Sequence, residues 1–211
     1  MAEITRLSGC NDWLELDFVE RERTPSELMK LGIRLHLAGL SLSNIISELE
    51  NFGVQRSRKA VHDWVQKADL QPASDASPDH IALDETVIRV NGQQYWLYAA
   101  ANSKTNRYLH IRLFTTTTTA LTQKFLREFC EGYDVSEAVF LVDHAHHLSA
   151  ALNRAGLRFQ TVRHGNRNAV ERIFREIKRR TSSFSNSFSH VDPATVETWL
   201  KSFAVWWNSL N

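Results

Sequence analysis

Three acidic residues lie far apart along the chain, in settings where their carboxylates could hold metal ions. Asp84 lies in a stretch rich in β-branched residues, Asp143 ends the apolar run AVFLVD, and Glu171 follows in an amphipathic stretch. Two Mg²⁺ ions held about 4 Å apart need several oxygen ligands, and three carboxylates from separate elements can supply them while leaving room for a substrate phosphate. The pattern therefore indicates two-metal chemistry on phosphodiester bonds.

The residues around Glu171 follow a helical repeat, in which positions three, four or seven apart share a face. Asn168, Glu171, Arg175 and Lys178 line up on one such face. The opposite face carries apolar side chains that would pack against a sheet: Val170, Ile173, Phe174 and Ile177. We expect Glu171 to bind metal while Arg175 and Lys178 hold DNA phosphates beside it. An alternative is an amphipathic surface helix with ordinary ion pairs and no catalytic role. The residue spacing, taken alone, favours this alternative over a metal-binding helix.

Other acidic and imidazole groups compete for these roles. Glu85 adjoins Asp84, but alternation along a strand points it to the opposite face. Glu176 would turn roughly 100° away from the polar row, which makes it a weaker candidate. A zinc site is an alternative for the histidines that follow Asp143, which are His144, His146 and His147. A loop leading into a helix is the simpler interpretation of this segment. A third, intermediate interpretation is that one of these histidines contacts substrate or metal-bound water.

The elements that must position these residues begin after a linker. Residues 80–90, 94–101 and 107–114 predict three strands, with Asn91-Gly92 as the turn of a hairpin. The five threonines 115–119 connect to a helix over residues 120–133, and the strand 138–143 follows it. A strand after a helix implies a mixed sheet. Shorter and later elements complete the order: a helix at 147–155, a strand at 158–162, and helices at 168–182 and 193–210.

The segment 26–68 predicts a separate module of about three helices. Ser41 caps the second helix, Gly53 can end it in the left-handed conformation, and Ser57 caps the third. This last helix places Ala60, Val61, Trp64 and Val65 on one face. It leaves four polar side chains available to solvent or DNA: Arg58, Lys59, His62 and Lys67. The length and order fit a helix-turn-helix.

Together these elements predict an α/β chain in which an all-α helix-turn-helix precedes a ribonuclease-H-like mixed sheet flanked by helices. The expected divisions are an N-terminal segment 1–24, a DNA-binding domain 25–69, a linker 70–79, a catalytic domain 80–190 and a C-terminal helix 191–211. Four tryptophans are expected to be core or dimer-contact residues: Trp96, Trp199, Trp206 and Trp207.

Composition narrows the class of protein. The net charge is +1, but residues 163–180 carry seven basic and two acidic side chains, a cluster that can attract phosphate. Cys10 and Cys130 lack a CxxC spacing and are expected to be free thiols. No apolar run approaches the roughly 20 residues of a membrane span, and no secretory signal is evident, so we expect a cytoplasmic, nucleoid-associated protein. GxSxG, P-loop, GxGxxG and HExxH patterns are absent from the sequence.

Three blocks of the sequence resemble the catalytic blocks of DDE transposases from insertion sequence family six, in its archaeal branch. They are IALDETVIRVNGQQYWLYAA, AVFLVDHAHHL and HGNRNAVERIFREIKRRTSSFSN. The stretch LHLAGLSLSNIISELENFGVQRSRKAVHDWVQKAD is similar to that group's helix-turn-helix, so the resemblance spans nearly the whole chain. At the second aspartate the chain departs from the family, since His144 and His146 stand where relatives have a small residue and a proline.

The resemblance implies that Asp84, Asp143 and Glu171 are the catalytic and metal-binding triad, with two Mg²⁺ or Mn²⁺ ions per site. Lys178 matches the family's basic residue seven positions after its glutamate. The implied substrates are double-stranded terminal inverted repeats and target DNA, joined in replicative, cointegrate-type transposition. Since two element ends must be held together, we expect a homodimer or larger assembly, with the C-terminal helix and its tryptophans as one candidate contact.

Two alternatives remain open. A decayed or domesticated copy would bind DNA without metal-dependent joining, and the two histidines beside Asp143 motivate this hypothesis. Another ribonuclease-H-like nuclease, acting on hybrids or junctions, would have little use for a helix-turn-helix that selects duplex sequence.

Overall fold

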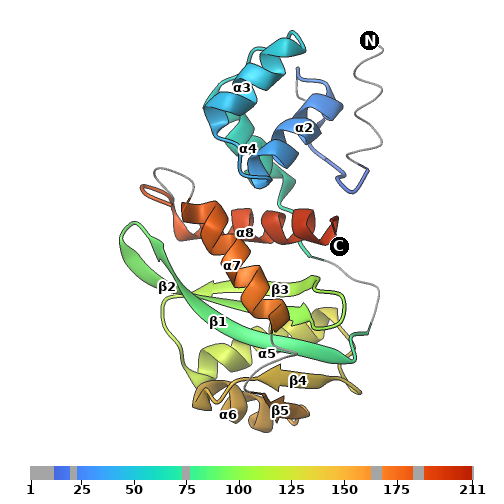
Figure 1. Cartoon of the computed structure of the whole chain (residues 1–211), viewed down its shortest axis with the longest axis vertical. Helices are drawn as coiled ribbons and strands as arrows, with labels where there is room; N and C mark the ends of the chain where they lie inside the picture. The colour runs from blue at the N-terminus through green and yellow to red at the C-terminus, as the bar shows by residue number, and fades with distance from the viewer. Residues whose placement is uncertain (1–11, 20–22, 73–76, 163–167, 183–187, 211) are drawn as a thin grey trace.

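The computed structural model describes residues 12–19, 23–72, 77–162, 168–182 and 188–210, with only the backbone at 168–170, 173 and 180–182. A three-helix unit lies at one end and a sheet with its flanking helices at the other (Figure 1). The helices are α2 (Ser26–Leu37), α3 (Leu42–Asn51), α4 (Arg58–Ala68), α5 (Thr119–Gly132), α6 (His146–Arg154), α7 (Asn168–Ser182) and α8 (Pro193–Asn208). The strands are β1 (His80–Val90), β2 (Gln93–Asn102), β3 (Tyr108–Phe114), β4 (Val139–Val142) and β5 (Phe159–Thr161).

The five strands form one mixed sheet in the order β3-β2-β1-β4-β5. β1, β2 and β3 are antiparallel neighbours, while β4 lies parallel to both β1 and β5. Asn91 and Gly92 have φ angles of 52° and 75°, which is the left-handed backbone that a two-residue hairpin turn requires. The predicted antiparallel trio, the hairpin and the mixed sheet flanked by helices are thus confirmed.

Alternation along β1 divides the core between the two faces of the sheet. Ile81 and Leu83 belong to the hydrophobic cluster that also contains the inward side chains of α5 and α6. Ala82 and Ile88 belong to the other cluster, which contains the inward side chains of α7 and α8. Helices therefore cover both faces, and consecutive β1 side chains enter different cores.

Local signals in the sequence set the ends of the N-terminal helices. The Ser41 and Ser57 hydroxyls accept hydrogen bonds from the backbone N–H groups of Asn44 and Ala60, each at 3.2 Å. Gly53 has a φ of 75° and follows the end of α3, as predicted. Thr118 caps α5 in the same way as the serines, so the threonine run is the connection that was expected.

A close approach holds the three-helix unit together. A Cβ atom added to Gly32 on α2 would lie 3.1 Å from the Trp64 ring on α4, so glycine permits this contact. Val61, Trp64 and Val65 are buried and Ala60 is partly buried, which confirms the predicted inward face of α4.

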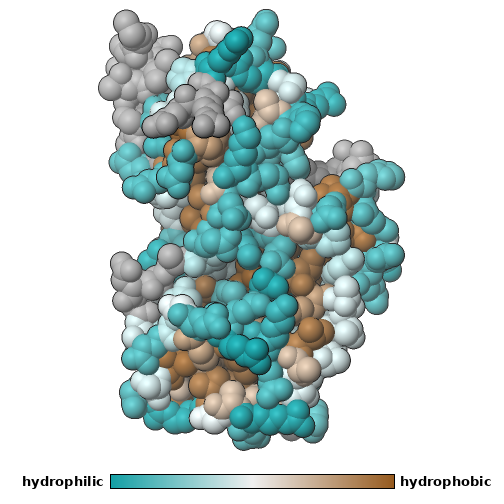
Figure 2. All heavy atoms as spheres, turned by 180° about the vertical axis from the view of Figure 1, so that it is seen from behind, coloured by the Kyte–Doolittle hydropathy of each residue, from teal (hydrophilic) through white to brown (hydrophobic). Residues whose placement is uncertain are grey.

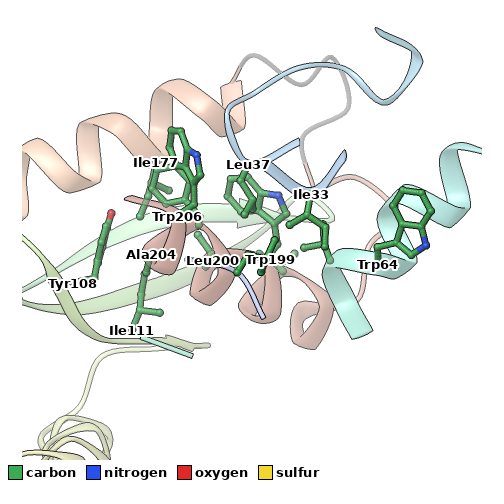
Figure 3. Packing of buried hydrophobic residues seen from close by; sticks show 14 of the residues in the cluster. Ile33, Leu37, Trp64, Tyr108, Ile111, Ile177, Trp199, Leu200, Ala204 and Trp206 are labelled. Atoms are coloured by element: carbon green, nitrogen blue, oxygen red, sulfur yellow. The ribbon is translucent and has the colours of Figure 1, made fainter. Parts of the chain in front are cut away.

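Helix α8 lies between the three-helix unit and the sheet, and it contacts α2, α4 and β3 (Figures 1 and 3). Trp199 and Trp206 are only 5% and 6% exposed, and both belong to the core cluster of the chain itself. The Trp207 indole donates to the Asn106 carbonyl oxygen at 2.9 Å. Trp199 and Trp206 are therefore core residues, whereas Trp96 and Trp207 are only partly buried, so the expected contact between subunits through the C-terminal helix stays a prediction.

Most large apolar side chains of the described residues are shielded from solvent. Hydrophobic atoms are more extensive around the sheet than over the three-helix unit when the molecule is seen from behind (Figure 2). Within the described ranges, Leu210 is the one large hydrophobic residue classed as exposed. None of the described helices combines the length and apolar character needed to cross a bilayer.

A buried histidine at the contact between α2 and α8 predicts acid sensitivity. His36 is 6% exposed, and its ring meets that of Trp199 edge to face at 6.5 Å. Burial, aided by the nearby His62, lowers the pKa of His36 from 6.5 to about 4. As the pH falls, His36 therefore becomes protonated near pH 6.5 in the unfolded chain but only near pH 4 in the folded chain. The contribution of neutral His36 to the free energy of unfolding is fully present above pH 6.5, and it is lost as the pH falls to about 4.

We expect the thermal unfolding temperature of the wild-type chain to fall more steeply between pH 7 and pH 4.5 than that of His36→Leu. The difference in unfolding free energy should approach about 3 kcal/mol at the acid end, since each pKa unit is worth about 1.4 kcal/mol. His110, whose pKa burial also lowers to about 4, is present in both proteins and cancels in the comparison. Parallel pH profiles would contradict the assignment to His36.

Candidate active site

Strand register brings the first two acidic residues of the triad together. β1 and β4 pair in parallel as His80 with Val139 and Ala82 with Leu141, an offset of 59 positions. Asp84 and Asp143 differ by the same 59 positions, so the register, if continued by two residues beyond the last pair, would set them side by side. Neighbouring strands lie about 4.8 Å apart. Asp143 directly follows the last residue of β4, where the prediction had it as the final strand residue.

The two aspartates share the sheet face that α7 covers. Asp84 pairs across the sheet with Ala99, which belongs to the core cluster on the α7 and α8 side. Asp143 lies two positions after Leu141, the partner of Ala82 on that same face. Ala99, Ala82 and Ala101 give Asp84 neighbours with small side chains. The carboxylates therefore point to the same side, with little side-chain bulk around the first of them.

Each aspartate is oriented by a backbone hydrogen bond from its own segment. Asp84 Oδ1 accepts from the Glu85 N–H at 2.9 Å, and Asp143 Oδ1 accepts from the Ala145 N–H at 2.7 Å. Asp84 is 8% exposed, whereas Asp143 is half-buried. Two carboxylates brought side by side at the edge of a core would concentrate negative charge, and a cation could compensate it.

Helix α7 carries the third acidic residue and packs on the same face. Phe174 and Ile177 are buried in the core there, and α7 contacts β1 and β2 (Figure 1). Glu171, Arg175 and Lys178 are exposed, so the predicted division of the helix into an apolar and a polar face is confirmed for the residues described. The side chains of Asn168, Val170 and Ile173 lie outside the described residues.

The carboxylate on the next face of α7 has a different role. Glu176 pairs with Arg179, whose Nε donates to Glu176 Oε2 at 3.0 Å. This is an ordinary ion pair within one helix turn, which agrees with the expectation that Glu176 is the weaker candidate.

The donor set suits a hard divalent cation, although the three carboxylates do not converge. Aspartate and glutamate oxygens are the ligands that Mg²⁺ and Mn²⁺ prefer. Across the described ranges, no group of three histidine, cysteine, aspartate or glutamate side chains is arranged to hold a metal ion. The register thus joins Asp84 and Asp143, while Glu171 does not complete a three-ligand group with them. The same observation argues against the zinc alternative.

The histidines after Asp143 divide between solvent and the core. His144 and His146 are exposed. His147, in the first turn of α6, places its Nε2 atom 3.1 Å from Glu85 Oε1. Glu85 therefore points to the face opposite Asp84, as strand alternation predicted.

The predicted DNA-contacting side chains of α4 lie in distinct surroundings. Arg58 and Lys59 are exposed, and Lys59 Nζ lies 2.6 Å from Asp63 Oδ2. His62 Nδ1 lies 3.5 Å from the other oxygen of Asp63. Lys67 Nζ lies 5.6 Å from the centre of the Phe18 ring. The group is thus at the surface, but Asp63 offsets part of its positive charge.

Sequence reasoning missed two contacts around the site. It treated Glu85 and His147 separately, although strand alternation and the start of the helix after Asp143 point both to the same side of the sheet. It also treated Asn91 only as a turn residue. Asn91 Nδ2 donates to the Val191 carbonyl oxygen at 2.8 Å, and its Oδ1 accepts from the Val191 N–H at 3.1 Å. No local signal relates positions 100 residues apart.

Residues 79–206 match the model of a family described as the DDE domain, of the IS240 transposase type. An uncharacterized protein of Methanocaldococcus jannaschii is 29% identical over 202 residues, which cover 92% of each chain.

Among solved structures, the HTLV-2 integrase catalytic core domain in complex with magnesium is 14% identical, with a TM-score of 0.48. The overlap covers 65% of this chain and 92% of that one. The simian T-cell lymphotropic virus intasome is 11% identical, with a TM-score of 0.47, over 83% of this chain and 67% of that one.

Proposed function

The chain belongs to the DDE domain family of IS240-type transposases, and from this premise we propose that it binds the terminal inverted repeats of an insertion sequence and joins them to target DNA. The products would be those of replicative, cointegrate-type transposition. The observation that supports the proposal is the offset of 59 positions between β1 and β4, which, continued by two residues beyond the last pair, would bring Asp84 beside Asp143 on one face of the sheet. We also infer that the chain represents the archaeal branch.

The catalytic role falls to three carboxylates. Asp84, Asp143 and Glu171 would hold two Mg²⁺ or Mn²⁺ ions, which activate the attacking oxygen and stabilise the leaving one. Asp84 and Asp143 are positioned in advance by the sheet and by their backbone hydrogen bonds. Glu171 has to approach them, because the three carboxylates do not form a metal-binding group in the structure described. Bound DNA and metal would provide the free energy for that approach.

Two helices would hold DNA. We propose that the three-helix unit is a helix-turn-helix whose α4 contacts the terminal repeats through Arg58, Lys59, His62 and Lys67. On α7, Arg175 and Lys178 would hold phosphates beside the reacting bond, together with Asn168. Helix α8 packs against both α4 and β3, and would thereby connect the three-helix unit to the sheet on which α7 lies.

The chemistry implies an assembly. Two element ends must be held at once, so we propose a homodimer or a larger complex on paired DNA ends, in a cytoplasmic, nucleoid-associated setting. The C-terminal helix α8 remains one candidate contact between subunits, through residues other than the buried Trp199 and Trp206.

The direct test is strand transfer. Labelled duplexes containing the DNA that flanks the gene on each side would be incubated with the chain, a supercoiled plasmid, and either Mg²⁺, Mn²⁺ or a chelator. Metal-dependent joining of flanking duplexes, and not of shuffled duplexes of equal length, is the expected result. Binding of the flanking duplexes without joining would favour the decayed copy that His144 and His146 suggest, and neither binding nor joining would overturn the proposal.

The exposed cations of α7 predict a salt effect. The double variant Arg175→Gln, Lys178→Gln should bind duplex DNA more weakly and reduce the slope of log affinity against log salt concentration by about 2, since each phosphate contact contributes about 0.9. Fluorescence anisotropy across a salt series measures that slope. The matched control is Lys124→Gln, Arg127→Gln, which removes two exposed cations from α5 on the other face of the sheet. Equal slopes for the two double variants would show that the α7 cations are not phosphate ligands.

A further inference from the structure

A polar contact lies directly behind the two aspartates, on the sheet face away from the proposed DNA. His147 Nε2 lies 3.1 Å from Glu85 Oε1, and the two side chains are 21% and 9% exposed. The Oε2 atom of Glu85 is buried as well. His147 Nε2 is also buried and makes no hydrogen bond among the described residues, so its approach to Glu85 is a close polar contact and not a hydrogen bond. Burying a polar group away from other polar groups is costly, so each side chain gains from having the other beside it.

Each partner in this contact lies within four residues of a proposed metal ligand in the chain. Glu85 immediately follows Asp84 on β1, and its backbone N–H donates the hydrogen bond that orients Asp84 Oδ1. His147 lies in the first turn of α6, two residues after Ala145, whose N–H orients Asp143 Oδ1. The side-chain contact therefore joins the two segments whose backbone amides hold the two aspartates.

The register between β1 and β4 does not fix this part of the chain by itself. The last recorded backbone pair is Ala82 with Leu141, two residues before the aspartates, and β4 ends at Val142. Beyond this point α6 is held by its hydrophobic side chains, such as Leu148, and by the contact between His147 and Glu85.

The surroundings of the contact restrict movement further. The Tyr98 ring meets the His147 ring at 6.3 Å, edge to face. Tyr98 pairs across the sheet with Glu85, and its hydroxyl lies 3.4 Å from Thr122 Oγ1 on α5. His147 on α6 thus contacts side chains of both β1 and β2.

We infer that Glu85 and His147 are positioning residues, which set the separation of Asp84 and Asp143 by tying the start of α6 to β1. They touch neither DNA nor metal in this scheme. The inference rests on the proposed function, since it assigns a purpose to the spacing of the two aspartates. Groups that orient metal ligands from behind typically change metal affinity or activity by 10-fold to 100-fold when they are removed.

The test compares two substitutions of the same side chain in the full-length protein. His147→Leu removes the polar contact and keeps an apolar side chain, whereas His147→Gln keeps an N–H donor close to the position of Nε2. Mn²⁺ binding would be measured by isothermal titration, and the Mn²⁺ concentration for half-maximal joining would be measured in parallel. We expect His147→Leu to weaken both by 10-fold to 100-fold, and His147→Gln to restore both to within about 3-fold of wild type.

The control separates positioning from general loss of stability. His110→Leu alters another largely buried histidine on the same face of the sheet, packed against Phe125 at 4.8 Å and two strands away from β1. It should change the unfolding temperature without changing Mn²⁺ affinity. Should His147→Leu fail to fold, Glu85→Gln provides the second variant and should weaken Mn²⁺ binding in the same range.

The outcomes distinguish this inference from the proposed function. Wild-type Mn²⁺ affinity in His147→Leu, or an equal loss in His110→Leu, would overturn the positioning role while joining by the wild-type chain continued. Failure of the wild-type chain to bind Mn²⁺ and to join DNA ends would overturn the proposed function itself, and with it the role assigned to the pair.

Discussion

Replacing Asp84 by asparagine is expected to reduce strand joining by at least about a thousandfold while leaving binding of DNA ends within about twofold. The carboxamide keeps the shape of the side chain but removes its negative charge and one anionic oxygen. A metal ion that stabilises charge in the transition state contributes several kcal/mol, and about 4 kcal/mol corresponds to three factors of ten in rate. End binding should persist because α4 belongs to the separate three-helix unit. Single-turnover joining and anisotropy would measure the two effects.

The stability of this variant should move in the opposite direction from its activity. Asp84 is 8% exposed, and continuing the β1–β4 register would bring its charge next to that of Asp143. Two like charges in a poorly solvated place would repel. Asparagine removes that repulsion, and we expect an unfolding temperature equal to or above that of the wild-type chain in the absence of metal. An inactive protein with unimpaired stability excludes misfolding as the cause.

Asp79→Asn is the matched control. Asp79 lies five positions earlier in the chain, is exposed, and pairs with Lys104 at 2.6 Å. Exposed pairs contribute roughly 0 to 1 kcal/mol, so the control should join DNA at the wild-type rate. If Asp79→Asn lost as much activity as Asp84→Asn, or if Asp84→Asn remained active, the assignment of Asp84 as a metal ligand would be wrong.

Much of the sheet could be predicted because its signals are local. The Asn91-Gly92 turn sets the β1–β2 hairpin, and the buried face of each strand follows from alternation. The spacing of 59 positions between Asp84 and Asp143 carries information that is not local. It equals the offset in register between the parallel strands β1 and β4, and this offset depends on how the helix and loops between the strands pack. The sequence supports the expectation that the aspartates meet, while the register gives the arrangement that brings them together.

Other features could not be predicted, because they depend on contacts between distant segments. Trp199 gives the same helical signal whether it packs against α2 or against a second subunit, and only the burial of the ring decides between them. The contact between Glu85 and His147 needs β1 and α6 in place. Glu171 also does not form a metal-binding group with Asp84 and Asp143 in the structure described. This depends on how α7 lies on the sheet, and the helical repeat along α7 carries no information about that packing.

Glu171→Gln is expected to reduce joining by at least about a hundredfold, corresponding to roughly 3 kcal/mol of lost transition-state stabilisation. Its effect on DNA binding should be opposite in sign. Glu171 lies on the exposed row of α7 with Arg175 and Lys178, so removing its charge leaves that row more attractive to phosphate. We therefore expect tighter binding of duplex DNA together with slower joining, measured on the same preparation.

The comparison with Glu176→Gln decides what Glu171 does. Glu176 is a second carboxylate on the same helix, five positions later, and it pairs with Arg179. Its substitution removes the same charge from the same helix, so any effect of helix charge on DNA binding should be common to both variants. Loss of joining in Glu171→Gln alone would mean that its carboxylate reaches Asp84 and Asp143 when DNA and metal are bound, although the three do not form a metal-binding group in the structure described. Equal activity in both variants would mean that two aspartates suffice, and loss in Glu176→Gln alone would reassign the third ligand.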